Sequence, residues 1–229
     1  EIAQLMSALG SETHLICRGN MVLRSFDEYV TDHLKEVLEN DDHLTLHANS
    51  NVQSVVKNAD GALTIQTERE TLVVDELIWA IGRGYNTHNI GLENTDVNVN
   101  EDGTITVDKF QETNVTDFYV LGDIMGGQFQ LTPVAIAAGR RLADRLHNGM
   151  TDRHLEYSKI PSIVFSHPPI GTTGITEKQA IAEYGADAVK CYTTSFTAMY
   201  SNFSTKPVKT AMKMVCVGED EKIVGIHLI

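Results

Sequence analysis

The sequence predicts a mixed α/β and α+β fold, and three observations lead to this prediction. Helix and strand patterns alternate over residues 1–50, as they do in a βαβ unit. Three short strand patterns separated by turn residues follow, which is typical of an antiparallel meander. Beyond Tyr157, strand patterns dominate and three of the five prolines cluster, namely Pro161, Pro168 and Pro169. The 229 residues are enough for one large or two small domains.

The opening segment is expected to form a helix, a strand and a second helix. Apolar residues at helical spacing predict a helix over Glu1–Leu9, which Gly10 ends. Thr13–Cys17 is a predicted strand. Ser25–Glu28 has the sequence of a capping box and so predicts the start of the second helix. The apolar face of that helix carries Tyr29, Val30, Leu34, Val37 and Leu38.

The middle of the chain is expected to contain several strands and one long helix. The continuous apolar runs Leu77–Ile81 and Phe118–Leu121 are typical of buried strands. Residues 85–116 lack a regular pattern, apart from a hairpin turn at Asp102–Gly103. A helix is predicted from Leu131–Pro133 to about His147, because proline is well tolerated in a first turn. The expected meander consists of Val52–Lys57, Leu63–Thr67 and Thr71–Val74, after a strand at Leu44–Leu46.

The last third of the chain is expected to be one antiparallel sheet with a helix. A capping box at Thr176–Gln179 predicts the start of the helix. The predicted strands are Ser162–Phe165, Val189–Thr194, Lys209–Val217 and Lys222–Ile229. The final strand is largely apolar and has to be covered, so we expect self-association through this part. Because the chain opens within a helical pattern and closes within a strand pattern, we expect it to belong to a longer protein.

Composition and charge exclude several classes of function. The net charge of −13 argues against a nucleic-acid binder, and no apolar run is long enough to span a membrane. The nine histidines lack metal-ligand spacing, so no metal is expected. Cys17, Cys191 and Cys216 are far apart, which fits unpaired thiols in a reducing cytoplasm.

Two arginines after the first strand are candidates for phosphate binding. In dinucleotide-binding folds, the residue directly after such a strand faces the adenine ribose. An acidic residue there selects NAD, whereas positive charge accommodates the 2′-phosphate of NADP. Arg18 occupies this position, and Arg24 lies six residues further on with no acidic residue between them. The alternative is that both are ordinary surface arginines.

Further candidates follow the second apolar run and the long helix. Asp123 could accept a hydrogen bond from a sugar or ribitol hydroxyl, or it could be a turn residue. The free N–H groups at the helix start near Thr132 could hold an anion, unless this is an ordinary amphipathic helix. Arg140 could hold a substrate carboxylate or lie on a solvated face. The segment Ser195–Tyr200 suits a loop that contacts a peptide-like ligand, although core packing is the alternative.

Taken in order, these segments resemble the class I pyridine nucleotide–disulfide oxidoreductases, and within them the enzymes that reduce glutathione disulfide. The resemblance covers essentially the whole chain, and its most specific stretches are Leu131–Arg140 and Phe165–Gly171. It implies the C-terminal part of a Rossmann-like NADP-binding domain with an antiparallel meander, a central segment and the start of an α+β dimerisation domain. The implied boundaries are 1–85, 86–157 and 158–229.

The resemblance also implies cofactors, partners and site residues. The cofactors would be FAD and NADP, the substrate glutathione disulfide, and the assembly a homodimer. The residues implied to bind cofactors are Glu1, Arg18, Arg24, Gly82, Arg83, Asp123, Leu131, Thr132 and Ile163. The residues implied to contact substrate are Arg140, Met199 and Tyr200.

The chain departs from the family pattern at Gly19, where many relatives have a basic residue or histidine, and at Gly84–Tyr85. The glycine fingerprint for FAD, the C-x-x-x-x-C disulfide and the segment with the acid–base histidine are not in the sequence, so no residue is assigned as catalytic. We expect the isolated chain to be inactive. Lipoamide dehydrogenase, mercuric reductase and trypanothione reductase are alternative relatives, and a nucleotide-binding and dimerisation module without activity is an alternative function.

Overall fold

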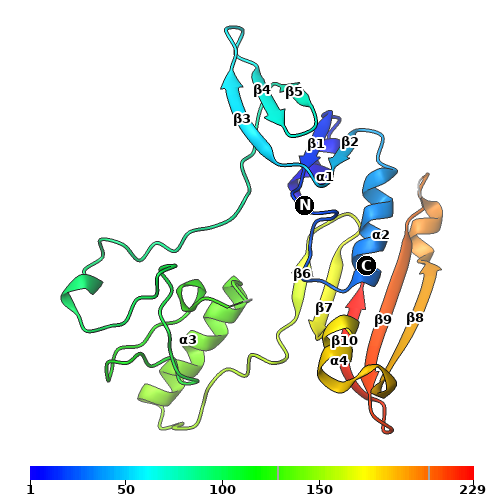
Figure 1. The fold of residues 1–229 in the computed structure, drawn as a ribbon. Helices are drawn as coiled ribbons and strands as arrows, with labels where there is room; N and C mark the ends of the chain where they lie inside the picture. The colour runs from blue at the N-terminus through cyan, green and yellow to red at the C-terminus, as the bar shows by residue number, and fades with distance from the viewer. Residues whose placement is uncertain (128, 206) are drawn as a thin grey trace. The chain divides into compact units, whose positions relative to one another are not determined.

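The computed structural model describes residues 1–127, 129–205 and 207–229. This part of the chain divides into two compact units, each with hydrophobic clusters of its own. The first unit combines Glu1–Ile78 with Pro161–Ile229, and the second comprises Trp79–Ile160. Figure 1 shows the helices and strands of both units.

The N-terminal segment of the first unit contains a βαβ arrangement. Strands β1 and β2 are parallel neighbours, with Thr13 opposite Leu44, and helix α2 connects them in sequence. The elements are α1 Ile2–Ala8, β1 Thr13–Ile16, α2 Glu28–Glu39 and β2 Leu44–His47. The predicted order of helix, strand, helix and strand is confirmed.

The start of helix α2 differs from its prediction. The N-cap is Asp27, whose Oδ1 accepts a hydrogen bond from the Tyr29 backbone N–H at 3.0 Å. The predicted capping box at Ser25 is therefore wrong. Ser25 lies in a tight turn, in which the backbone N–H of Phe26 donates to the carbonyl of Leu23 at 2.9 Å. Because this turn uses a positive φ of 59° at Leu23, helical geometry begins only after it.

The predicted meander is present in the first unit. Its strands are antiparallel in the order β3-β4-β5. Gly61 has a positive φ of 95° in the first turn, which glycine adopts without steric cost. The strands are β3 Val52–Lys57, β4 Leu63–Thr67 and β5 Thr71–Val74.

The C-terminal segment of the first unit is one five-stranded antiparallel sheet. Its strand order is β6-β7-β10-β9-β8, so the predicted antiparallel sheet of the last three strands is confirmed. The capping box at Thr176 and Gln179 is also confirmed. The elements are β6 Ser162–Val164, β7 Ile170–Gly174, α4 Glu177–Tyr184, η3 Ala186–Ala188, β8 Val189–Thr197, η4 Met199–Phe203, β9 Lys209–Val217 and β10 Lys222–Leu228.

Helix α2 and the C-terminal sheet share one hydrophobic core. The buried residues Val30, Leu34 and Leu38 recur every four positions and so form one face of the helix. They belong to the same buried cluster as Ile170, Ala211 and Ile229. Full burial of such an aliphatic side chain contributes about 1.5–3 kcal/mol. Two segments that are remote in sequence therefore stabilise each other as one unit, and Figure 1 shows α2 beside strands of the sheet.

A cluster of charged side chains is buried in this unit. Lys213 on β9 donates from Nζ to Asp27 Oδ1 at 2.8 Å and to Glu177 Oε2 at 2.6 Å. The exposed fractions of the Asp27 and Lys213 side chains are only 2% and 6%. Burial by itself raises the pKa of Asp27, but hydrogen bonds from Lys213 and from the N–H groups of Glu177 and Tyr29 outweigh it, so the pKa is lowered. Burial lowers the pKa of Lys213, yet the two carboxylates reverse this and raise it.

His227 on β10 lies beside this cluster and is held between two hydrogen bonds. Its side chain is 1% exposed. Its Nε2 donates to the carbonyl of Ile175 at 3.1 Å, and its Nδ1 pairs with the Thr172 hydroxyl. The Thr172 hydroxyl can donate to Nδ1, so the neutral ring satisfies both contacts. Burial is the largest cause of a lowered pKa at His227 and outweighs the attraction of Asp27 for a proton.

The second unit is mostly irregular and is organised by one helix. Helix α3 spans Thr132–His147 as predicted, and Val134, Ala138 and Leu142 form its buried face. The short helices η1 Leu92–Asn94 and η2 Asp123–Met125 precede it. Isolated bridges join Val99 to Ile105 and Glu112 to Tyr119. The irregular course predicted for residues 85–116 is confirmed.

Two predicted strands are wrong. Leu77–Ile81 forms no strand, and Ile78, Trp79 and Ile81 are 54–70% exposed. A strand needs a hydrogen-bonded neighbour, and no described residue pairs with this run, which lies where the chain passes from the first unit to the second. Phe118–Leu121 is not a regular strand either. Only Tyr119 makes a bridge, although Val120 is buried as expected.

No helix among the described residues is long and apolar enough to cross a membrane.

The burial of His227 predicts a specific pH dependence of stability. An unfolded histidine takes up a proton near pH 6.5, whereas folded His227 remains neutral to lower pH. The unfolded state therefore binds more protons as the pH falls below about 6.5, and the free energy of unfolding decreases. We expect His227→Gln, which keeps a donor and an acceptor, to reduce this acid-side loss in thermal unfolding between pH 7.5 and pH 5.

The matched control is His43→Gln, at an exposed histidine whose pKa is raised by Glu12. This variant should retain the loss of stability on the acid side. If the His227 variant lost as much stability on the acid side as the unmodified protein, buried His227 would not be the cause of this loss.

Candidate functional site

The loop between β1 and α2 presents two exposed arginines. Strand β1 ends at Ile16, one residue earlier than predicted, so Arg18 is the second residue after it, and Arg24 lies near the other end of the loop. A Cβ atom added at Gly19 would lie 3.2 Å from Arg24 Cδ, so the Arg24 side chain passes close to this glycine. Gly19 therefore leaves room for the Arg24 stem. Both guanidinium groups remain open to solvent, which suits binding of an anion such as a phosphate.

The first turn of α2 offers no second anion site beside these arginines. A helix N-terminus attracts anions through its free N–H groups. Here Asp27 already accepts from the N–H of Tyr29 and places a negative charge at the helix start. An anion bound to this loop therefore depends on the arginine side chains.

Glu1 and Ile163, two predicted cofactor residues, lie in neighbouring segments. The Glu1 carboxylate accepts a hydrogen bond from the backbone N–H of Phe165 at 2.6 Å, two residues beyond Ile163. Gln4 on α1 makes two hydrogen bonds to the backbone of His167, at 2.6 and 3.0 Å. Ile163 is 59% exposed. The structure therefore brings the start of the chain to the end of β6 and leaves Ile163 accessible.

Arg83 and Asp123, two further predicted residues, are brought together in the second unit. Arg83 Nη1 lies 3.6 Å from Asp123 Oδ2, with side chains 79% and 43% exposed. An exposed pair at this distance contributes little to stability, about 0–1 kcal/mol. Gly82 has a positive φ of 151°, so the backbone turns just before Arg83. Both charged groups remain available to a ligand.

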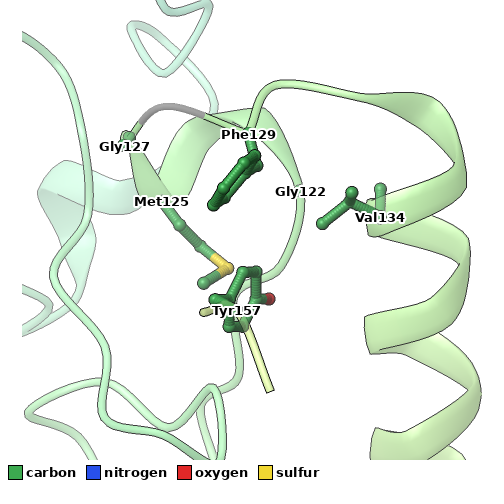
Figure 2. Close-up of a pocket in the computed structure, with 8 residues that line it drawn as sticks. Gly122, Met125, Gly127, Phe129, Val134 and Tyr157 are labelled. Carbon is green, nitrogen blue, oxygen red and sulfur yellow. The ribbon is translucent and has the colours of Figure 1, made fainter. Parts of the chain in front are cut away.

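A cavity of about 240 Å³ lies between the Asp123 region and the start of α3. Figure 2 shows Met125, Phe129 and Tyr157 turned toward one another, with Val134 extending from α3 toward the same space. The N-cap of α3 is Leu131, which has no side-chain oxygen to cap the helix. Thr132 at the first position is exposed. The lining residues are Gly122, Met125, Gly126, Gly127, Phe129, Val134, Ala135 and Tyr157.

Two groups next to the residues that line this cavity suit a flavin. Asp123 offers a carboxylate for a hydroxyl group, and the uncapped start of α3 favours negative charge. Sequence reasoning identified Asp123, Leu131 and Thr132 but missed the apolar lining. The adjacent glycines Gly126 and Gly127 could have indicated a binding site in the sequence. They lie between the apolar run Phe118–Leu121 and helix α3, and glycines allow a ligand to approach the backbone closely.

The predicted substrate residues belong to different units. Arg140 is exposed on α3 in the second unit. Met199 and Tyr200 lie on η4 in the first unit, where their exposed fractions are 81% and 89%. The alternative of core packing is therefore wrong for these two side chains. Their segment is only partly a loop, because Ser195–Thr197 continues strand β8.

The described residues contain neither a disulfide nor a metal cluster. Burial is the largest cause of a raised pKa at both Cys17 and Cys191, which keeps these thiols protonated and poorly nucleophilic. Cys216 is a free, buried cysteine. No group of three or more His, Cys, Asp or Glu residues in the described ranges could hold a metal ion.

Comparison with known proteins identifies the family. The sequence profile of the pyridine nucleotide-disulphide oxidoreductases matches residues 1–139. The chain belongs to this family. The profile of the family's dimerisation domain matches residues 160–229. The family is named for a pyridine nucleotide, and the exposed arginine pair offers the positive charge that suits a phosphate group of such a ligand.

Curated relatives agree with the family assignment. The chain is 41% identical to glutathione reductase from Schizosaccharomyces pombe and 42% identical to glutathione reductase from Debaryomyces hansenii. Both alignments cover 100% of this chain but only 50% and 48% of the relatives. The chain thus spans about half the length of the curated relatives it matches.

Solved structures show the same fold. A mutant of the HOCl-induced flavoprotein disulfide reductase RclA from Escherichia coli, in complex with Cu(II), matches with a TM-score of 0.87 and 25% identity. The match covers 99% of this chain and 50% of RclA. The non-mutant Cu(II) complex matches with a TM-score of 0.85 at 25% identity, over 99% of this chain and 50% of RclA.

Proposed function

We propose that the full-length protein that contains this chain is an NADPH-dependent flavoprotein disulfide reductase that converts glutathione disulfide to glutathione. The observation that carries this proposal is the 41% identity to a glutathione reductase over the whole of this chain. NADP and FAD would supply the hydride chemistry, while the residues of this chain bind and orient them. The proposed domain boundaries are 1–85 for the nucleotide-binding part, 86–157 for the central part and 158–229 for the interface part.

The proposed nucleotide site lies in the first unit. Arg18 and Arg24 bind the 2′-phosphate, supported by their exposure and by the lack of an acidic residue between them. Glu1 and Ile163 lie on the nicotinamide side, supported by the contact of Glu1 with the segment that follows Ile163. Glu1 fixes the backbone of Phe165 and leaves the apolar side chain of Ile163 free to contact a planar ring.

The proposed flavin site lies in the second unit. Asp123 accepts a hydrogen bond from a ribitol hydroxyl, and Gly82 and Arg83 line the cofactor path. Leu131 and Thr132 present the uncapped helix start to the negatively charged edge of a reduced flavin. The cavity lined by Met125, Phe129 and Tyr157 supports this location.

The proposed substrate residues are Arg140, Met199 and Tyr200. The guanidinium of Arg140 suits a carboxylate of glutathione, and the two exposed side chains on η4 suit its peptide backbone. We also propose a cytoplasmic location, supported by the three free cysteines.

The choice of substrate can be tested with the purified full-length protein. We expect NADPH oxidation to accelerate on addition of glutathione disulfide and not on addition of lipoamide. The readout is the loss of NADPH absorbance. Faster turnover with lipoamide than with glutathione disulfide would contradict the proposed substrate but not the family.

The choice of NADP over NAD can be tested at the two arginines. We expect Arg18→Ala combined with Arg24→Ala to weaken NADPH binding by about 2–4 kcal/mol, because two charge-assisted contacts are lost. Binding of NADH should change little, because it lacks the 2′-phosphate. The measurement is kcat/KM for each coenzyme, with Arg69→Ala on the exposed turn between β4 and β5 as control. A wild-type protein that uses both coenzymes equally would exclude the proposed preference.

The dimerisation profile over residues 160–229 supports a homodimer. Ile223, Ile226 and Leu228 on strand β10 are 37–53% exposed, which is consistent with a surface that another protein part covers. We expect sedimentation of the full-length protein at micromolar concentration to give the mass of a dimer. A monomer under these conditions would argue against this assembly.

A further inference from the structure

One buried carboxylate caps two helices that are remote in sequence. Asp27 Oδ1 accepts from the N–H of Tyr29 in the first turn of α2, at 3.0 Å. Asp27 Oδ2 accepts from the N–H of Glu177, the first residue of α4, at 2.9 Å. A single side chain thus fixes the start of α2 against the C-terminal segment of the same unit.

Lys213 makes this arrangement possible. A carboxylate that is 2% exposed is strongly destabilising unless a cation compensates its charge. Lys213 supplies the cation at 2.8 Å and is itself bound to Glu177 at 2.6 Å. Two further titratable groups lie near the cluster. His227 Nε2 lies 3.9 Å from Asp27 Oδ2 and donates to Ile175 instead, and Cys191 is a thiol whose raised pKa, caused mainly by burial, keeps it neutral. The positive charge next to Asp27 therefore comes from Lys213.

The arginine loop is anchored at both ends, and Asp27 is one of the two anchors. At the first end, the backbone N–H groups of Asn49 and Ser50 donate to the carbonyls of Gly19 and Cys17, at 2.7 and 3.0 Å. At the second end, the loop enters α2 at Asp27, three residues after Arg24. Between the two ends, Met21 is buried in the core cluster and Leu23 packs against it, so Asp27 is one of several contacts that fix the position of Arg24.

We propose that Lys213, on the sheet of the dimerisation segment, is a positioning residue that sets the coenzyme preference through Asp27 and the arginine loop. The inference rests on the proposed role of Arg18 and Arg24 in binding the 2′-phosphate. Charge-assisted contacts to phosphate need distances of about 2.7–2.9 Å. A displacement of about 1 Å in a positioned group can reduce activity by up to about 100-fold. Loss of Lys213 leaves the buried charge of Asp27 without a cation, which destabilises the position of Asp27 at the second end of the loop although its two backbone hydrogen bonds remain.

The decisive measurement is the ratio of kcat/KM for NADPH to kcat/KM for NADH in the flavin-loaded full-length protein. We expect Lys213→Met to lower this ratio about tenfold, mainly through a higher KM for NADPH. Activity with NADH should fall much less, because NADH does not use the arginines. A merely structural role would reduce the activity with both coenzymes together and leave the ratio unchanged.

Two further variants complete the experiment. Lys190→Met removes a lysine from the adjacent strand β8, where it forms an exposed pair with Glu221 at 2.6 Å. This control should leave the ratio unchanged. Asp27→Asn combined with Lys213→Met removes both buried charges and retains an oxygen that can cap α2. This double variant should fold and still show the lower ratio, because the single amide oxygen of asparagine cannot accept from both helix starts as the two carboxylate oxygens of Asp27 do.

The outcomes separate this inference from the proposed function. If the double Arg18 and Arg24 variant loses the preference for NADPH but Lys213→Met does not, the positioning role is rejected and the proposed function stands. If the arginine variant keeps the preference, the proposed coenzyme site itself is wrong. If neither Lys213 variant folds, the pair is a folding determinant and the positioning role is rejected.

Discussion

The first unit depends on the burial of Asp27 beside Lys213. Helix α2 has an apolar face that the two-stranded parallel pair β1–β2 is too small to bury alone. The C-terminal sheet supplies the remaining apolar partners, and Asp27 joins the two segments at the helix start. A buried carboxylate has to be paired with a cation. The pairing of Asp27 with Lys213 therefore fixes the position of helix α2 relative to the sheet.

The two helix starts near the proposed cofactor sites differ in their electrostatics. The start of α2 is capped by a carboxylate that is paired with a lysine, so the proposed phosphate site relies on the nearby arginines instead. The start of α3 has no side-chain cap and borders a cavity lined mainly by apolar side chains. The two proposed sites would therefore hold an anion differently, through arginine side chains at one and through a helix dipole at the other.

The positive charge of Arg18 and Arg24 is opposite in sign to the net charge of the whole chain. With a net charge of −13, this chain taken as a whole repels an anion such as a phosphorylated coenzyme. In the proposed site, Arg18 and Arg24 would have to overcome this repulsion by close contact, so their placement matters more than their number. The proposed effect of Lys213 on coenzyme preference rests on this dependence on placement.

The sequence by itself determined most of the order of helices and strands, the meander, the antiparallel sheet of the last three strands and the family motifs, because these depend on local periodicity and turn chemistry. It did not predict strand β7 at Ile170–Gly174. It failed at Leu77–Ile81, where apolar composition predicts a buried strand but hydrogen-bonded pairing requires a partner that no described residue provides. It failed at Ser25, because a capping motif cannot reveal the turn that displaces the helix start to Asp27. Only the tertiary structure revealed the pairing of Asp27 with Lys213. The two residues are 186 positions apart, and a contact of this kind results from packing and produces no periodic pattern in the sequence.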